Sequence, residues 1–341
     1  MKPTDFAYLL TRYLGQYLPG QRNLSPRTIE SYRDAFKLLL QFGRVQRGWT
    51  AEQVCMAHLD RACVEGFLDW LETDRHCSAV TRNQRLAALR AFFRWVSFEA
   101  PDQLAGAQQI LGIPRKRTAT HAVAYLTPEA LQILLAQPDR TTTDGRRDAV
   151  LLSVLYDTGA RVQEVVDVVV RDVRLAAPAV VTLTGKGSKQ RQVPLMKPTA
   201  SLLSAYVDEH RLGGHERSDS PLFVSRQRQK LTRWGVTYIL QKYVDAARAQ
   251  APGGFPAIVT PHVLRHTKAM HLLQAGVNLI YIRDLLGHSN VATTEMYARA
   301  DTEMKRRALE AGALPSPATA PRPWREDTNL MQWLQRLGAP S

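Results

Sequence analysis

Residues 158–195, TGARVQEVVDVVVRDVRLAAPAVVTLTGKGSKQRQVPL, change from a helical pattern to a strand pattern. Gly159 allows the chain to turn sharply into a short helix over about 161–166. β-branched residues then dominate three short segments, and Gly185-Lys186-Gly187-Ser188 has the composition of a hairpin turn. The stretch therefore predicts Lys186 at an exposed hairpin tip, and strands at Val168–Val173, Val180–Thr184 and Gln190–Pro194.

Helical patterns lie on both sides of this stretch. Apolar residues recur with helical spacing, and Ser25-Pro26 and Thr127-Pro128 each place a proline directly after a capping residue. We therefore expect a mainly α fold with a small antiparallel β-sheet. The other predicted helices cover about 4–18, 26–42, 62–73 and 79–98, then one from 128, and 144–157, 198–212, 231–249, 261–275, 278–286, 290–299 and 302–310.

Changes in pattern divide the chain into four parts. We expect residues 1–105 to form a helical domain of about four helices, and residues 123–311 to form a second domain that contains the sheet. Residues 106–122 lose their periodicity and carry Arg115, Lys116 and Arg117, as a basic interdomain linker would. Residues 312–341 predict a Pro- and Ala-rich connection and a short amphipathic helix with Leu330, Trp333, Leu334 and Leu337.

Composition and charge narrow the class of protein. A chain of 341 residues with 45% hydrophobic residues is long enough for two folded domains. We expect no membrane span and no signal peptide, and the three cysteines fit the reducing cytoplasm. The net charge of +14 is spread as +6 over residues 1–120 and +8 over the remainder. This distribution favours a polyanionic partner, most simply nucleic acid, over a basic protein that has no such partner.

Candidate functional residues continue along the chain. Arg161 at a helix start and Lys186 at a hairpin tip could each reach an anion, although each residue taken alone is more often a surface charge. His262, Arg265 and His266 share one helix face, because positions i, i+3 and i+4 lie together. A zinc-protease helix is excluded, since valine follows His262 where H-E-x-x-H needs glutamate, and no obvious carboxylate completes a metal site. His266 by itself is favoured as a buried structural histidine.

A last pattern lies near residue 290. Gly287 is placed to end a helix, and His288 falls in the turn before the next helix. Tyr297 comes late in that following helix, where a lone tyrosine is usually a packing residue.

In chain order, Arg161, Lys186, His262-x-x-Arg265, His288 and Tyr297 resemble the tyrosine recombinase, or phage integrase, family. The segments T-G-A-R-x-x-E, G-K-G-x-K-x-R-x-V-P-L, H-x-L-R-H-T and L-L-G-H-S carry the resemblance, and Thr81–Trp95 is similar to the family's core-binding domain. Lys268 and Met270 depart from the small or polar residues that relatives often carry, and the tail beyond Gly312 is poorly covered. The resemblance implies a four-helix core-binding (SAM-like) domain and a catalytic domain of the DNA breaking-rejoining enzyme fold.

The resemblance also implies a chemistry. DNA strands would be cleaved and rejoined through a covalent 3′-phosphotyrosine intermediate, with Tyr297 as the nucleophile. Arg161 and Arg265 would stabilise charge on the phosphate, and Lys186 would protonate the leaving 5′-oxygen. The supporting roles are proton transfer at the nucleophile by His262, phosphate donation by His288, orientation of Arg161 by Glu164, and packing by His266. We expect no cofactor and no metal, because arginines take the place of the cation.

The partners expected are double-stranded DNA and further copies of the chain, as a tetramer on two paired sites, with related recombinases as possible partners. Candidate DNA contacts are Arg82, Arg85, Arg90, Arg94, Arg115, Lys116, Arg117, Lys189 and Arg191. The role we expect is integration, excision or transposition of a mobile element, in the cytoplasm with the nucleoid. The alternatives are a type IB topoisomerase-like enzyme and a catalytically inactive DNA-binding regulator.

Overall fold

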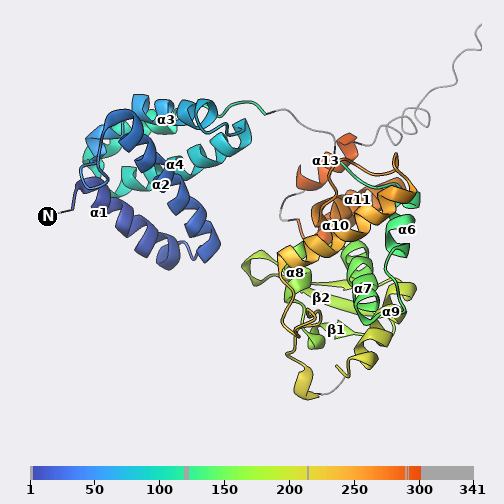
Figure 1. The fold of residues 1–341 in the computed structure, drawn as a ribbon. Helices are drawn as coiled ribbons and strands as arrows, with labels where there is room; N and C mark the ends of the chain where they lie inside the picture. Colours follow the sequence, from blue (N-terminus) through green and yellow to red (C-terminus); the bar gives the residue numbers. More distant parts are fainter. Residues whose placement is uncertain (1–2, 119–122, 213–214, 289, 291, 301–341) are drawn as a thin grey trace, which may run out of the picture. The chain divides into compact units, whose positions relative to one another are not determined.

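The computed structural model describes residues 3–118, 123–212, 215–288, 290 and 292–300. By its internal contacts the chain divides into two units, residues 1–121 and 122–341 (Figure 1). The helix predicted at 302–310 and the predicted connection and terminal helix of 312–341 lie outside the described residues. No helix among the described ranges is long and apolar enough to cross a membrane.

All regular secondary structure described in the first unit is helical. Its main helices begin at capping side chains, because Thr4, Ser25, Asp60 and Ser78 each accept a hydrogen bond from a backbone N–H of the first turn. Their apolar faces enclose one core rich in aromatic residues. The elements are α1 (Asp5–Arg12), η1 (Tyr13–Gln21), α2 (Pro26–Arg47), η2 (Met56–His58), α3 (Arg61–Thr73), α4 (Ala79–Glu99), η3 (Pro101–Gln103) and α5 (Leu104–Leu111).

Two elements of this unit differ from the sequence prediction. The helix expected over about 4–18 continues after Arg12 as a π-helix, η1, which buries Tyr13 and Leu18 five residues apart and contains Pro19. The helix α5 occupies the start of the stretch expected as a linker, because Ala107 and Ile110 are buried in the core of the unit. The stretch beyond α5, as far as Thr118, has no regular secondary structure.

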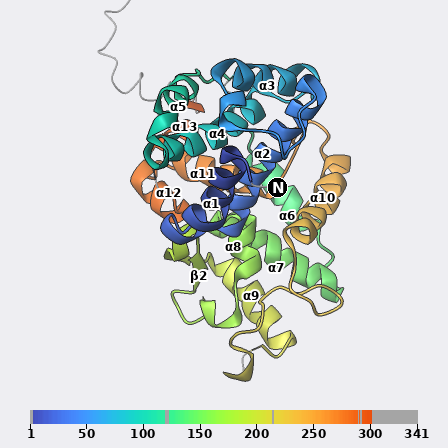
Figure 2. The same ribbon diagram turned by 90° about the vertical axis from the view of Figure 1, so that its left-hand side faces the viewer.

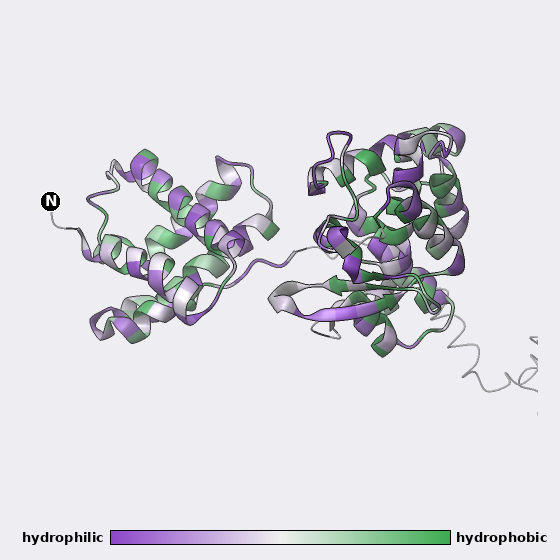
Figure 3. Ribbon diagram, turned by 90° about the horizontal axis from the view of Figure 1, so that it is seen from below, coloured by the Kyte–Doolittle hydropathy of each residue, from purple (hydrophilic) through white to green (hydrophobic). Residues whose placement is uncertain are grey.

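The second unit surrounds a small sheet with helices. Hydrophobic and hydrophilic residues alternate along the helices of both units (Figure 3), as expected for elements with one buried face. The elements are α6 (Pro128–Ala136), α7 (Thr143–Thr158), α8 (Val162–Asp167), η4 (Val170–Asp172), β1 (Val173–Arg174), β2 (Val180–Thr184), η5 (Lys186–Ser188), β3 (Gln190–Pro194), α9 (Lys197–Glu209), η6 (His215–Arg217), α10 (Arg233–Gln250), α11 (Pro261–Gln274), α12 (Leu279–Leu286) and α13 (Ala292–Ala300).

The sheet has the strand order β1-β2-β3, and both pairs are antiparallel. Strands β2 and β3 have the predicted bounds, with Val181 opposite Val193. The prediction of a strand over Val168–Val173 is wrong, because only Val173–Arg174 pair with β2. Backbone groups of residues 168–171 bond instead to the segment 218–222. The β2–β3 hairpin, which ends in η5, protrudes from the unit (Figures 1 and 3).

Helix α11 organises the region that carries the candidate catalytic residues. It packs against α7, α12 and α13, and more lightly against α10. Figure 2 shows α11 and α12 next to each other in orange. Leu264 of α11 belongs to the main core of this unit, whereas Ala269, Met270 and Tyr297 form a second cluster with α12. Helix α11 thus contributes side chains to both cores, and its residues between Leu264 and Ala269 lie where the two cores meet.

Candidate active site

Arg161 stands at the first residue before α8, in extended conformation. Gly159 precedes it with a φ of +55°, and a Cβ atom there would lie 2.7 Å from Cδ2 of Leu286. A side chain at residue 159 would therefore separate the end of α7 from the end of α12. This close approach brings Arg161 next to Gly287, whose carbonyl oxygen is 3.5 Å from Arg161 Nη2.

Glu164 is a buried acceptor between two arginines. Its carboxylate accepts from the backbone N–H and Nη1 of Arg161, both at 2.9 Å, and from Arg191 Nη2 at 2.7 Å. Burial alone would raise the pKa of Glu164, but these donors outweigh it and hold the pKa below its usual range. Glu164 is therefore ionised, and its hydrogen bonds hold the backbone N–H and the guanidinium of Arg161 in place.

Arg191 lies inside the site rather than on an open surface. It is one of the predicted DNA contacts, and its guanidinium bonds to Glu164 and, at 2.8 Å, to the Leu285 carbonyl oxygen. Gly287 leaves room for it, because a Cβ there would lie 2.8 Å from Arg191 Nη1. Arg191 thus ties the sheet to the end of α12. The motif around residues 185–195 contains this arginine, but its spacing does not distinguish a buried role from a surface role.

Arg265 is buried in α11, with 1% of its surface exposed. Nη1 donates to the Gly159 carbonyl oxygen at 2.8 Å and Nη2 to the Leu286 carbonyl oxygen at 2.7 Å. Its Nε has no hydrogen-bond partner among the described residues. Burial and the nearby Arg161 lower the pKa of Arg265 to about 10, so it stays charged at neutral pH. A buried, unpaired donor on a cation is a group that an anionic ligand would satisfy.

Three histidines and the tyrosine face these arginines. Nδ1 of His266 lies 2.9 Å from the hydroxyl oxygen of Tyr297, and the two rings pack at 5.5 Å. The ring of His262 packs on His266 at 4.3 Å, with its side chain exposed. The ring of His288 is nearly parallel to that of Tyr297 at 6.4 Å, and its Nδ1 lies 2.9 Å from Thr294 Oγ1. Among these contacts the phenol shares its hydrogen bond with His266 rather than with His262, the histidine that the family resemblance implies at the nucleophile.

The environment keeps these rings neutral. Burial, then the charge of His262 and of Arg265, lowers the pKa of His266 to about 4. Burial, then the two arginines, lowers the pKa of His288 to about 4. The pKa of His262 is lowered for the same reasons. Burial raises the pKa of Tyr297, which Arg265 and Arg161 partly oppose. The site thus holds a protonated phenol beside neutral imidazoles and two guanidinium cations.

Lys186 begins the 3-10 turn η5 at the tip of the protruding hairpin, as expected for a residue on an exposed turn. Its side chain is outside the described part of the structure. The other five candidate catalytic residues lie close to one another around the ends of α7, α11 and α12.

The basic residues expected to contact DNA have different surroundings. Arg82 is buried beside Glu72, with Nε 3.3 Å from the carboxylate, and Arg85 donates to the Ser31 carbonyl oxygen. The ammonium group of Lys116 also pairs with Glu72. The half-buried members of the set are Arg85, Arg90 and Arg191, and the exposed members are Arg94, Arg115, Lys116, Arg117 and Lys189.

Lys268, which departs from the family pattern, is buried and ion-paired. Its Nζ lies 3.8 Å from Asp157 Oδ1 and 4.7 Å from the centre of the Tyr156 ring. Burial lowers its pKa, which Asp157 opposes. The departure is therefore accommodated by a carboxylate at the end of α7.

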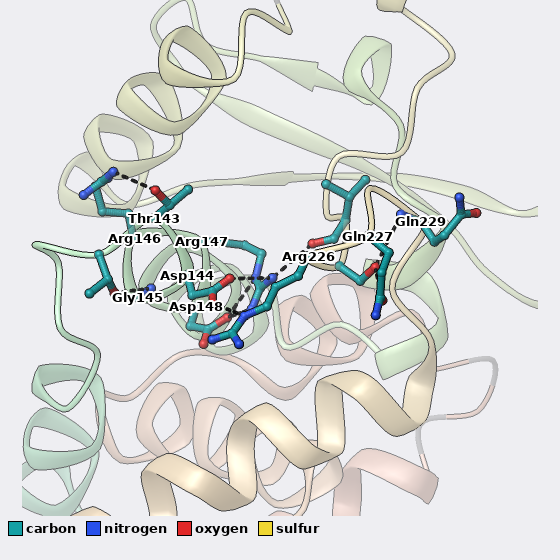
Figure 4. Close-up of polar contacts among 12 residues, drawn as sticks. Thr143, Asp144, Gly145, Arg146, Arg147, Asp148, Arg226, Gln227 and Gln229 are labelled. Atoms are coloured by element: carbon teal, nitrogen blue, oxygen red, sulfur yellow. Dashed lines mark hydrogen bonds and ion pairs between the residues drawn. The ribbon is translucent and has the colours of Figure 1, made fainter.

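A second concentration of charge lies at the opposite end of α7, about 24 Å away by helix length. Figure 4 shows Asp144 and Asp148 facing Arg147 and Arg226. Arg147 donates to Asp148 at 2.7 Å and Arg226 pairs with Asp144, beside a hollow of about 840 Å³. These guanidinium groups are balanced by carboxylates, so we place the candidate active site at the other end of the helix. No group of three potential metal ligands occurs in the described ranges.

The model of the phage integrase family matches residues 124–304, and that of the phage integrase N-terminal SAM-like domain matches residues 10–99. A protein of Sinorhizobium fredii named as an integrase/recombinase, y4rC, is 38% identical over 98% of this chain and 99% of its own. Tyrosine recombinase XerD of Listeria monocytogenes is 30% identical over 82% of this chain and 90% of its own.

Solved structures share the fold at lower identity. XerH site-specific recombinase bound to its difH substrate has a TM-score of 0.64 at 21% identity, and covers 85% of this chain and 80% of its own. The Tn1549 transposon integrase with transposon right end DNA has a TM-score of 0.66 at 17% identity, covering 89% and 98%. These likenesses agree with the predicted mainly α fold, its small antiparallel sheet and its two named domains.

Proposed function

The chain belongs to the phage integrase family of tyrosine recombinases, and from that premise we propose that Tyr297 cleaves duplex DNA at a specific site. The phenol oxygen bonds to the scissile phosphorus while the bond from phosphorus to the 5′-oxygen breaks, which leaves a 3′-phosphotyrosine. Attack by a 5′-hydroxyl reverses the step and rejoins the strands. Because the phosphotyrosine bond conserves the energy of the phosphodiester, the reaction needs no nucleotide cofactor.

One observation carries this assignment: the buried guanidinium of Arg265, which lies within electrostatic reach of Arg161 and Tyr297, has an Nε without a partner among the described residues. A phosphodiester would supply the missing acceptor. Arg265 and Arg161 would then stabilise the charge of the pentacoordinate transition state, where one such donor contributes about 3–4 kcal/mol. Glu164 orients Arg161 through the hydrogen bond to Nη1.

The remaining groups complete the chemistry. Lys186, on the protruding turn, would protonate the leaving 5′-oxygen. His288 and His262 would donate hydrogen bonds to the phosphate.

The biological setting is part of the proposal. Two of the relatives are named as an integrase/recombinase and as a tyrosine recombinase, and the basic charge of both units favours a DNA partner. Exchange between two duplexes requires four active sites, so we infer a homotetramer on paired sites, with related recombinases as possible partners. Integration, excision or transposition of a mobile element, in the cytoplasm with the nucleoid, is the role that suits such exchange.

The proposal is tested with DNA selected from a random duplex pool by the Tyr297→Phe protein, which keeps the ring and loses only the nucleophilic oxygen. On a nicked version of the selected duplex, the unmodified chain should form a covalent adduct on denaturing gels, and Tyr297→Phe should form none. Lys186→Ala should also fail, and a bridging 5′-phosphorothiolate should rescue it because sulfur leaves without protonation. An adduct from Tyr297→Phe would remove Tyr297 as the nucleophile.

The same substrates separate the two alternatives. A catalytically inactive DNA-binding regulator would bind the selected duplex and form no adduct. A type IB topoisomerase-like enzyme would form the adduct and relax supercoils but would not exchange strands between two duplexes.

A further inference from the structure

The hydroxyl of Tyr297 meets one imidazole nitrogen. Nδ1 of His266, on the second turn of α11, lies 2.9 Å from that oxygen, at a distance suited to proton transfer. The ring of His262, one turn earlier, meets that of His266 edge-on, at an interplanar angle of 71°, and His262 is exposed. The histidine of the H-x-x-R motif is therefore one residue removed from the reacting oxygen.

We propose that His266 is a catalytic residue that accepts the Tyr297 proton during strand cleavage, an inference that rests on the proposed function above. The phenol donates its hydrogen bond to Nδ1. As the oxygen–phosphorus bond forms, the proton moves to Nδ1, and the 5′-oxygen leaves with a proton from Lys186. In rejoining, the proton on Nδ1 returns to the phenol oxygen as the phosphotyrosine bond breaks.

The surroundings of His266 are compatible with this role. The charged or titratable groups facing it are His262 and Arg265 on α11 and Tyr297 on α13, with His288 packed on the Tyr297 ring. Burial, His262 and Arg265 keep the ring neutral at pH 7, so its Nδ1 can accept a hydrogen bond. A bound phosphodiester adds negative charge, which favours the imidazolium that the transfer creates.

The same helix provides a matched control. Nδ1 of His271 lies 2.8 Å from the hydroxyl of Tyr156, and its Nε2 lies 2.9 Å from the Leu126 carbonyl oxygen. Both histidines are half-buried and each contacts one tyrosine hydroxyl, but the described contacts of His271 include no candidate catalytic residue. If His266 served only in packing, His266→Gln and His271→Gln should have similar effects on adduct formation.

The test uses the full chain and a nicked selected duplex with a bridging 5′-phosphorothiolate, so that leaving-group protonation does not limit the rate. His266→Gln should slow single-turnover adduct formation by about 10²-fold at pH 7, within the range for general base catalysis. Its rate should rise about tenfold per pH unit from pH 6 to 8, because the phenol must now ionise into solvent. The unmodified chain should vary much less over that range, and His271→Gln should stay within about threefold of it.

A second measurement separates proton transfer from positioning. Fluorinated tyrosine at position 297 has a more acidic phenol, and it should restore most of the rate of His266→Gln. In the chain that keeps His266, fluorinated tyrosine at position 297 should change the rate little. This measurement tests the proposal even where His266→Gln does not fold. Equal defects with both tyrosines, or a loss below about threefold, would overturn the proposal. Absence of any adduct from the unmodified chain would instead refute the proposed function itself.

Discussion

Glu164→Gln tests whether a buried carboxylate holds the arginines of the site. The Glu164 side chain is 4% exposed and that of Arg191 is 14% exposed, so their pair is buried, whereas Arg161 is 44% exposed. Breaking a buried ion pair costs about 3–5 kcal/mol. Loss of the pair with the more exposed Arg161 adds at most about 1 kcal/mol. Glutamine keeps one acceptor oxygen, so we expect a loss of about 3 kcal/mol of unfolding free energy.

The measurement is thermal unfolding of the full chain at pH 7, with Glu209→Gln as the control. Glu209 binds Arg146 at 2.6 and 2.8 Å, but both side chains are about one-third exposed. We expect a fall in Tm of about 6–12 °C for Glu164→Gln and at most about 4 °C for the control. Equal shifts for the two variants would refute the reasoning from burial.

The loss of stability in Glu164→Gln should depend on pH. The folded pKa of Glu164 lies below its usual range, so its contribution is present above the unfolded pKa of about 4.3 and is lost as the pH falls through the folded value. The difference between the unmodified chain and Glu164→Gln should therefore narrow below about pH 4. A difference that grows in acid would contradict an ionised Glu164. Adduct formation should also slow at least about tenfold, because Arg161 loses its anchor.

Three further predictions concern packing, a buried ion pair and DNA binding. Gly287→Ala should lower the free energy of unfolding, measured with denaturant, by about 2 kcal/mol or more, because φ is +65° and the new Cβ meets Arg191. Gly187→Ala, with φ of +74° and open space around the new Cβ, should lower it by only about 1 kcal/mol. Lys268→Met should destabilise the fold while Asp157→Asn in the same chain restores part of the loss, and a double-mutant cycle without coupling would exclude the pair. Affinity for the selected duplex should fall linearly in log–log form with salt, and a flat response would count against phosphate contacts.

The prediction from sequence was accurate where structure depends on neighbouring residues. Capping residues and their following prolines placed the starts of α2 and α6, and β-branched runs placed β2 and β3. The same propensity failed at Val168–Val173, where bonds to residues 218–222 and the burial of Val168 override the strand pattern. The family was identified from the order and spacing of six residue types, because those types are what the chemistry demands.

The tertiary structure decided which groups meet. Nothing in the spacing of H-x-L-R-H-T indicates that His266 rather than His262 lies against Tyr297, since the two partners are 31 residues apart and meet through the packing of α13 on α11. Arg191 reads as one more surface cation in sequence, yet the approach of the hairpin to α12 buries it on Glu164. A sequence pattern specifies residue types and local conformation. Burial and partner choice depend on contacts between distant segments, which arise only when the helices pack.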